Sequence, residues 1–146
     1  MDREQRAFLD NRLVEVIRES PMGEKLRQLA KTLIGISGTH VSLPVIEEDI
    51  NAILTRSRAW DHPDITMRRG RACHCHGNSC DLWDANRDRL VLCTGYALSK
   101  DGIWRQHSWC WWPGQDRIAE TTTKREVYYG FEMTDDEAEQ FCIDNP

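Results

Sequence analysis

The stretch from Cys73 to Thr122 decides the fold, and four segments stand out in it: Cys75-His76-Gly77-Asn78, Gly95-Tyr96-Ala97-Leu98, His107-Ser108-Trp109 and Glu120-Thr121-Thr122. The residues after the first segment predict a helix over 78–88, with Asn78 or Ser79 as its N-cap. Apolar and alternating residues then predict strands at 89–98, 104–112, 117–122 and 127–131. Turn residues lie between the first three strands, at 99–102 and 113–116. The stretch therefore predicts one helix followed by an antiparallel meander.

Helical patterns flank this stretch. Apolar residues at helical spacing predict helices over 3–19, over 23–35 and from near Ser42 to just before Trp60. Thr134, followed by acidic residues, predicts a last helix over 135–143. The expected fold is α+β in a single domain, 1–146, with the thiol-bearing helix packed on a small antiparallel sheet. We expect a helical lead-in (1–60), a polar linker (61–72), the α+β core (73–132) and a C-terminal helix (134–144).

Composition narrows the range of partners and compartments. The net charge is −5, and no extended basic patch exists, so nucleic acid and an anionic membrane are not expected as partners. No apolar run resembles a signal peptide or a membrane span, which predicts a cytoplasmic protein whose six cysteines are reduced. The composition gives no indication of the oligomeric state.

The order of the motifs suggests an activated cysteine. Cys75 would lie just before the predicted helix, where the helix dipole lowers the pKa of a thiol. His107 lies in the second predicted strand and can act as the base, while Glu120 follows in the next strand. On adjacent antiparallel strands the two side chains can share one face of the sheet, but a slip of one residue in the register would turn Glu120 away.

These motifs resemble the papain-like and transglutaminase-like cysteine enzymes. They particularly resemble a group of small bacterial and phage proteins that carry a Cys-x-x-Asn helix start, a Gly-Tyr-Ala strand, a His-x-Trp strand and an acid-x-Thr strand. The resemblance covers about a third of the chain, from Cys75 to Thr122. It implies a nucleophile at Cys75, a base at His107 and an orienting acid at Glu120. One departure is that Glu stands where Asp or Asn is more common.

Several site residues have more than one interpretation. Cys80 also lies near the predicted helix start and is an alternative nucleophile. Asn78 is expected to bind an oxyanion or to cap the helix. The remaining cysteines, Cys73, Cys93, Cys110 and Cys142, are expected to be small buried hydrophobes. A possible substrate cleft would be lined by Trp83, Tyr96 and Trp109.

The motifs favour the prediction of a cysteine-dependent hydrolase, deamidase or transferase that acts through a thioester without a cofactor. Its substrate would be a protein, a peptide or another amide. One alternative is a zinc-stabilised module, with ligands among Cys73, Cys75, His76 and Cys80. Another is a catalytically inactive module whose tryptophan-rich sheet binds a partner protein.

Overall fold

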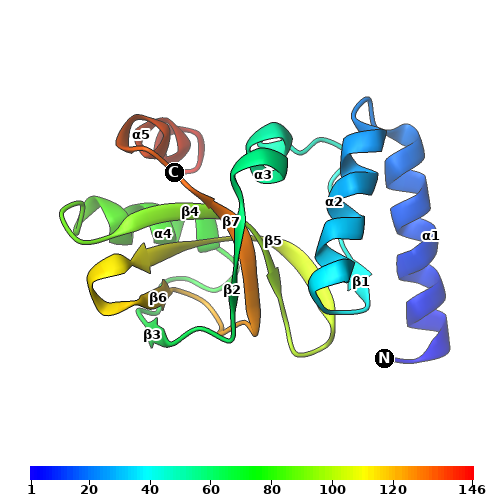
Figure 1. Cartoon of the computed structure of the whole chain (residues 1–146), viewed down its shortest axis with the longest axis horizontal. Helices are drawn as coiled ribbons and strands as arrows, with labels where there is room; N and C mark the ends of the chain where they lie inside the picture. Colours follow the sequence, from blue (N-terminus) through cyan, green and yellow to red (C-terminus); the bar gives the residue numbers. More distant parts are fainter.

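The computed structural model describes residues 1–146, which form helices and strands around one curled sheet (Figure 1). The helices are α1 (Arg3–Glu19), α2 (Gly23–Ile36), α3 (Ile50–Arg56), α4 (Cys75–Asp84) and α5 (Asp135–Asp144), with a short 3-10 turn at Pro113–Gln115. The strands are β1 (His40–Val41), β2 (Arg58–Asp61), β3 (Ile65–Met67), β4 (Val91–Leu98), β5 (Ile103–Trp112), β6 (Arg117–Glu120) and β7 (Val127–Glu132). The expected α+β class is confirmed.

The sheet is not a simple meander. Its strand order is β2-β7-β4-β5-β6-β3, and β1 pairs with the start of β5. β7 returns to pair with β4, so that β4 lies between β5 and β7 in an antiparallel arrangement. The β1–β5 and β3–β6 pairs are parallel. The expected meander is therefore wrong after β6, because the chain crosses back to the opposite side of β4.

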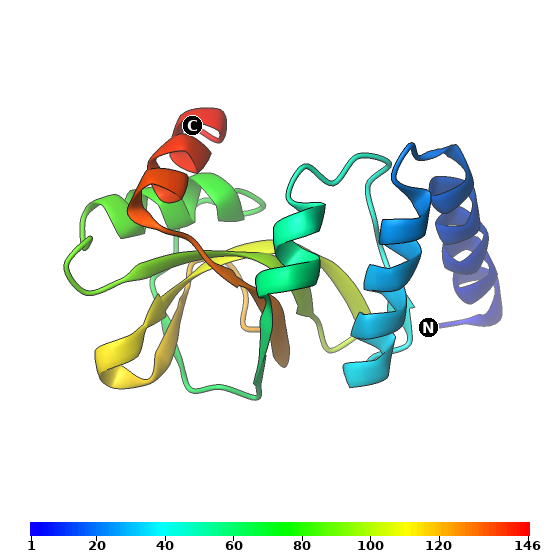
Figure 2. The ribbon, with the colours of Figure 1, turned by 45° about the horizontal axis from the view of Figure 1, so that its top comes forward.

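Alternating side chains divide the core between the two faces of the sheet. One face packs against the helices, in a cluster of 22 buried residues that includes Trp83, Tyr96 and Trp104. In Figure 2, α4 and α5 lie over the same side of the sheet. The other face curls around a smaller cluster of seven residues: Trp60, Cys93, Ala97, Trp109, Trp111, Ile118 and Tyr128.

Gly95 pairs with Gly130 where β7 lies close against β4. A Cβ at this position would lie 2.3 Å from the backbone oxygen of Tyr129, a separation that real structures do not tolerate. Its partner in the register, Gly130, lies under the ring of Trp109, whose Cη2 would be 2.6 Å from an added Cβ. The glycine of the Gly-Tyr-Ala segment thus allows the two strands to pair beside His107, its neighbour on β5.

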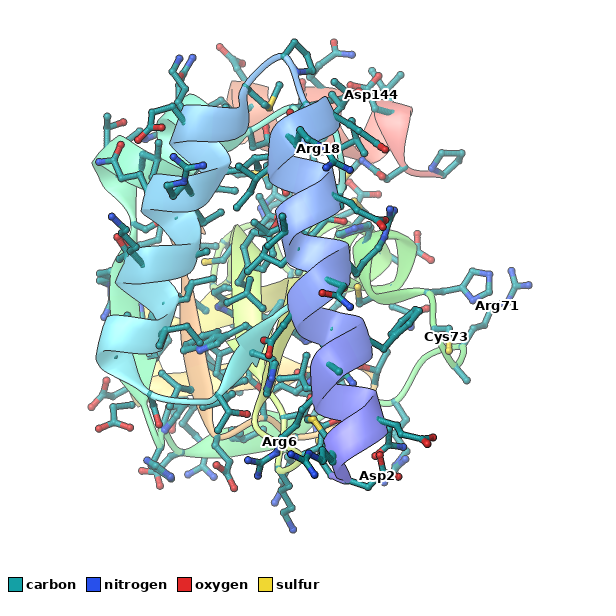
Figure 3. The ribbon with its side chains drawn as sticks, turned by 90° about the vertical axis from the view of Figure 1, so that its right-hand side faces the viewer. Asp2, Arg6, Arg18, Arg71, Cys73 and Asp144 are labelled. Atoms are coloured by element: carbon teal, nitrogen blue, oxygen red, sulfur yellow. The ribbon has the colours of Figure 1, made fainter.

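The N-terminal helices pack at one end of the sheet. Four residues of α2 are buried, whereas Val16 is the only buried residue of α1. Figure 3 shows α1 running along the outside of the molecule, with Arg6 and Arg18 along its length. Phe8 of this helix is 68% exposed. None of the helices combines the length and the apolar character needed to cross a membrane.

Three expected segments differ from the structure. The third helix begins only at Ile50, because residues 42–49 form an irregular segment in which the Glu47 side chain bonds to Tyr96 and Gln106. The lead-in is not wholly helical, since β2 pairs with β7. The expected linker contains β3, which pairs with β6. The two strands have only four and three residues, too few to give an alternating signal.

The last helix provides a prediction about stability. The Thr134 side chain accepts a hydrogen bond from the backbone of Glu137, whose side chain accepts one from the backbone of Thr134. We expect Thr134→Ala to lower the free energy of unfolding by about 1 kcal/mol, measured by urea denaturation. Asp2→Ala removes the equivalent cap of α1 and is the matched control. It should cost less, because the first turns of α1 are exposed; equal losses would contradict this account.

Candidate active site

Cys75 is the first residue of α4, directly after the N-cap residue His74. Backbone hydrogen bonds hold the loop before Cys75 against the end of β6. The N–H of Arg68 donates to the carbonyl oxygen of Glu120 at 2.8 Å, and the N–H of Gly70 donates to that of Thr121 at 2.9 Å. The half-buried thiol therefore lies at the positive end of the helix dipole. Such a position stabilises a thiolate.

The start of α4 lies beside an unpaired part of β5. On this side of β5, β1 pairs only with residues 103–104 and β6 only with residues 110–112. Between them, Ser108 contacts His76 of α4, and the His107 side chain comes close enough to Cys75 to lower the pKa of its thiol. The gap in the strand pairing thus gives the helix terminus access to a histidine on the far side of the sheet.

His107 and Glu120 form a buried pair. Nε2 of His107 lies 2.7 Å from Oε1 of Glu120, and the side chains are 2% and 0% exposed. The β5–β6 register puts Glu120 on the same face as Ile118, inside the curled sheet. Trp109 stacks beside the His107 ring, with 6.0 Å between ring centroids and 22° between planes. The acid therefore fixes one ring nitrogen, and Nδ1 remains for the thiol.

Glu120 is held by several donors besides His107. Oε1 accepts from the Tyr128 hydroxyl at 2.8 Å, while Oε2 accepts from the backbone N–H groups of Thr121 and Thr122 at 2.9 and 3.0 Å. Burial raises the pKa of Glu120, but the interaction with His107 and these donors lower it by a larger amount. The pKa therefore lies below its ordinary value. Glu120 therefore remains ionised in the interior.

Cys75 and His107 form the proton-sharing pair of the site. Burial raises the pKa of Cys75, but its interactions with His107 and His76 outweigh this effect and lower the pKa to about 5. Burial lowers the pKa of His107, but its bonds to Cys75 and Glu120 raise it above the ordinary value. A thiolate and an imidazolium are thus the favoured states at neutral pH.

No protein-family model, curated protein or solved structure matches this chain.

His76 is a second imidazole at the site, considered in the sequence only as a zinc ligand. Its Nδ1 lies 3.9 Å from the Cys75 sulfur and 2.5 Å from Oγ of Ser108. Ser108 in turn lies 2.8 Å from Oγ1 of Thr94, which donates to the carbonyl of His107 at 3.4 Å. If each hydroxyl donates once along this chain, Ser108 donates to Thr94 and accepts from His76. Nδ1 of His76 then carries a proton that also faces the thiolate.

The other cysteines have different environments. Cys80 is buried against α5, and burial together with the neighbouring Cys142 thiol raises its pKa. It is therefore a poor nucleophile compared with Cys75. Cys93 and Cys110 are buried as expected, but Cys73 is exposed and Cys142 is half-buried. Those two expectations are wrong, since Cys73 lies in the loop before α4, which projects from the molecule in Figure 3.

The proposed zinc ligands do not converge. No group of three or more His, Cys, Asp or Glu side chains in the chain is arranged to hold a metal ion. Cys73 is exposed on the loop, whereas Cys80 is buried one and a half turns into α4, by the helical repeat of about 3.6 residues. The donor set Cys73, Cys75, His76 and Cys80 does not fit tetrahedral coordination.

Two further expectations are wrong. Asn78 does not cap α4, because His74 is the N-cap and the Asn78 amide instead pairs with the backbone N–H and carbonyl of Arg71. That amide holds the preceding loop and is not free to bind an oxyanion. Trp83, Tyr96 and Trp109 line no cleft, because each is at most 1% exposed and belongs to one of the two cores.

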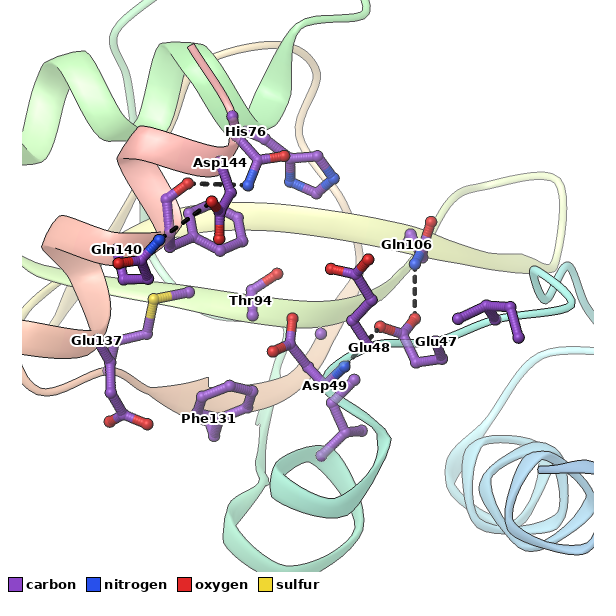
Figure 4. A pocket seen from close by; sticks show the side chains of 16 residues that line it. Glu47, Glu48, Asp49, His76, Thr94, Gln106, Phe131, Glu137, Gln140 and Asp144 are labelled. Atoms are coloured by element: carbon purple, nitrogen blue, oxygen red, sulfur yellow. Dashed lines mark hydrogen bonds between the residues drawn. The ribbon is translucent and has the colours of Figure 1, made fainter. Parts of the chain in front are cut away.

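A cavity of about 430 Å³ lies next to the site on the helix-covered face of the sheet (Figure 4). Its walls are β4, β5 and β7, the turn at 46–49 before α3, and α5. His76, Thr94 and Gly95 form the side nearest Cys75. Sequence reasoning missed this cavity and Tyr128, because both depend on the return of β7 to β4, for which the chain carries no local signal.

Proposed function

We propose that this chain is a cysteine-dependent acyl-transfer enzyme that cleaves or transfers an amide or ester through a thioester on Cys75. The observation that carries the proposal is the set of thiol, imidazole and carboxylate brought together here: Cys75 at a helix N-terminus has its pKa lowered by neighbouring His107, whose Nε2 is fixed by buried Glu120. The parts of an activated cysteine nucleophile are a lowered thiol pKa, a base and an orienting group.

The proposed reaction has two stages. The Cys75 thiolate attacks the carbonyl carbon, and the His107 imidazolium then donates its proton to the leaving amine or alcohol as the C–N or C–O bond breaks. Water or another acceptor next attacks the thioester carbonyl and gives a proton to His107. The acid or transferred acyl product leaves, and Cys75 regains its thiolate. Glu120 keeps the imidazole oriented and favours its charged form, and the backbone N–H groups at the start of α4 are available to the oxyanion.

The arrangement of elements supports a papain-like or transglutaminase-like core within the α+β fold. The thiol-bearing helix α4 packs against β5, and the histidine and the acid lie on the successive strands β5 and β6. This is the order of parts that the sequence resemblance implies. All six cysteines are free thiols, which suits a reducing compartment such as the cytoplasm.

Acylation by an activated ester tests the proposal. After incubation with p-nitrophenyl acetate near neutral pH, we expect mass spectrometry to find one acetyl group, on Cys75. The Cys80→Ala variant should acylate as the wild type does, whereas Cys75→Ala should acquire no acetyl group and retain its circular dichroism spectrum. Acetylation spread over several cysteines, or undiminished in Cys75→Ala, would contradict the proposed mechanism.

A further inference from the structure

The cavity beside the site is continuous with the nucleophile through His76. The His76 ring forms one wall of the cavity, and its Nδ1 lies 3.9 Å from the Cys75 sulfur. The ring packs edge-on against Phe141 of α5, with 5.5 Å between the centroids. A group held in the cavity therefore lies one side chain away from the thiolate. Its volume of about 430 Å³ is within the range of small-molecule sites.

Apart from His76, the ionisable side chains that line this cavity are all acidic. Five carboxylates line it, and no lysine or arginine does; the acids are Glu47, Glu48, Asp49, Glu137 and Asp144. Arg56 neutralises Glu137 from outside, through two hydrogen bonds of 2.7 and 2.9 Å. The other four carboxylates form no salt bridge within the chain, although Asp144 accepts from Gln140.

Glu47 shows most clearly that a positive charge is missing. Its side chain lines the cavity, yet the residue is only 4% exposed. Oε2 is held by two neutral donors, the Tyr96 hydroxyl and the Gln106 amide, both at 2.6 Å. Buried carboxylates are ordinarily paired with a cation, because burial without a counter-charge is costly.

The neighbouring acids repeat this pattern. Burial and the charges of Glu47 and Glu48 raise the pKa of Asp49, and His76 opposes this rise only in part, so the three acids in the turn repel one another. Figure 4 shows the labelled carboxylates of Glu47, Glu48 and Asp49 at the same side of the pocket. A cation in this position would relieve the repulsion and complete the environment of Glu47.

We propose that the cavity binds the ammonium or guanidinium group of the substrate on which Cys75 acts. This inference rests on the proposed function, and it narrows the substrate class to amides or esters with a cationic side chain or an amine-bearing acceptor. The carboxylates at 47–49 bind the charge, and His76 lies between that charge and the reacting carbonyl at Cys75. An anionic substrate group is disfavoured by the same charges.

Thiol reagents of different charge test the inference on the full chain. The rates of Cys75 modification by 2-bromoethylamine, iodoacetamide and iodoacetate are measured near neutral pH. Each rate is divided by the rate at which the same reagent modifies free glutathione, which corrects for the reagent's intrinsic reactivity. We expect the normalised rate of the cationic reagent to exceed that of the anionic one by about tenfold or more, the effect of one short-range charge pair. The neutral reagent reports thiol activation independently of charge.

Two variants locate the source of the preference. Glu48→Gln combined with Asp49→Asn removes two cavity charges whose side chains form no salt bridge, so this variant is expected to fold. The charge preference should fall at least about threefold in it, as expected when a partly screened charge pair is lost. Asp136→Asn removes an exposed charge of α5 outside the cavity and should leave the preference unchanged. No preference, or equal loss in both variants, would overturn the cavity assignment while leaving activation by iodoacetamide intact.

A binding measurement on Cys75→Ala separates this inference from the proposed chemistry. In titrations followed by NMR, n-butylamine should shift the side-chain amide signals of Gln106 and Gln140, which line the cavity. Butyrate should not shift them. If both compounds or neither shift these signals, the cation site is refuted even if Cys75 proves to be an activated nucleophile. If n-butylamine alone does so while Cys75 proves unreactive, the cation site stands and the acyl-transfer proposal fails.

Discussion

Replacing His107 with alanine is expected to raise the pKa of Cys75 from about 5 towards about 8.5, the ordinary value of a thiol. The interaction with His107 is the largest single cause of the lowering; His76 also lowers the pKa, and burial of the thiol raises it. The measurement is the rate of iodoacetamide alkylation of Cys75 as a function of pH, followed by mass spectrometry. The midpoint of this profile should move up by about 3 pH units.

The height of the profile should also change. A thiolate of higher pKa is a stronger nucleophile, with a Brønsted coefficient of about 0.4–0.5, so the limiting rate at high pH should rise in His107→Ala. At about pH 6 the loss of thiolate outweighs this gain, and the net rate should fall by roughly tenfold. Turnover should fall much more, because the leaving group loses its proton donor.

His62→Ala is the matched control for this experiment. His62 is exposed and contacts only its neighbour Asp61 among side chains, so its removal should leave the midpoint unchanged. A wild-type midpoint of about 8.5 would contradict the assignment of His107 as the partner of Cys75. A midpoint near 5 that is unchanged in His107→Ala would contradict it as well.

The second large effect concerns stability. Glu120→Gln should lower the free energy of unfolding by about 2–4 kcal/mol near neutral pH, measured by urea denaturation. Every group that contacts the Glu120 carboxylate donates to it, including His107, Tyr128 and the backbone of Thr121. An amide must present its NH₂ group to some of these donors, which leaves buried polar groups unpaired.

The pH dependence of this effect has a definite sign. The pKa of Glu120 is lower in the folded chain than in the unfolded chain, so its stabilisation is fully present above the unfolded value of about 4.3. It is lost as the pH falls through the lowered folded value, and the gap between wild type and Glu120→Gln should narrow in acid. Glu126→Gln, a nearby acid whose side chain forms no salt bridge, is the control. Equal stability of the two variants would show that Glu120 does not hold the site together.

The sequence predicted those parts of the fold that depend on local patterns. α1, α2 and α5 begin and end within two residues of the expected bounds, because amphipathic spacing and the Thr134 cap are local signals. β4 and β5 follow from alternating residues and the Asp101-Gly102 turn, and their pairing puts Gly95 opposite His107. The expected pairing of neighbouring strands also brings His107 and Glu120 together, because β5 and β6 are joined by a short turn in the required register.

The remaining features depend on contacts between distant parts of the chain. Tyr128 bonds to Glu120 only because the sheet curls and β7 returns beside β4. Glu47 was expected within the helix predicted to begin near Ser42. Instead, hydrogen bonds from Tyr96 and Gln106 hold its side chain in an irregular turn. The tryptophans were expected partly as cleft walls, yet a sheet with two covered faces buries them in two cores instead.

The central claim is that Cys75 is a thiolate at neutral pH. The most direct measurement is the ultraviolet absorbance of the thiolate, taken as the difference between wild type and Cys75→Ala and titrated from about pH 4 to about pH 9. The account predicts a single transition with a midpoint near 5 and full thiolate absorbance at neutral pH. A midpoint near the ordinary value of about 8.5 would contradict it, since Cys75 would then be an unactivated thiol.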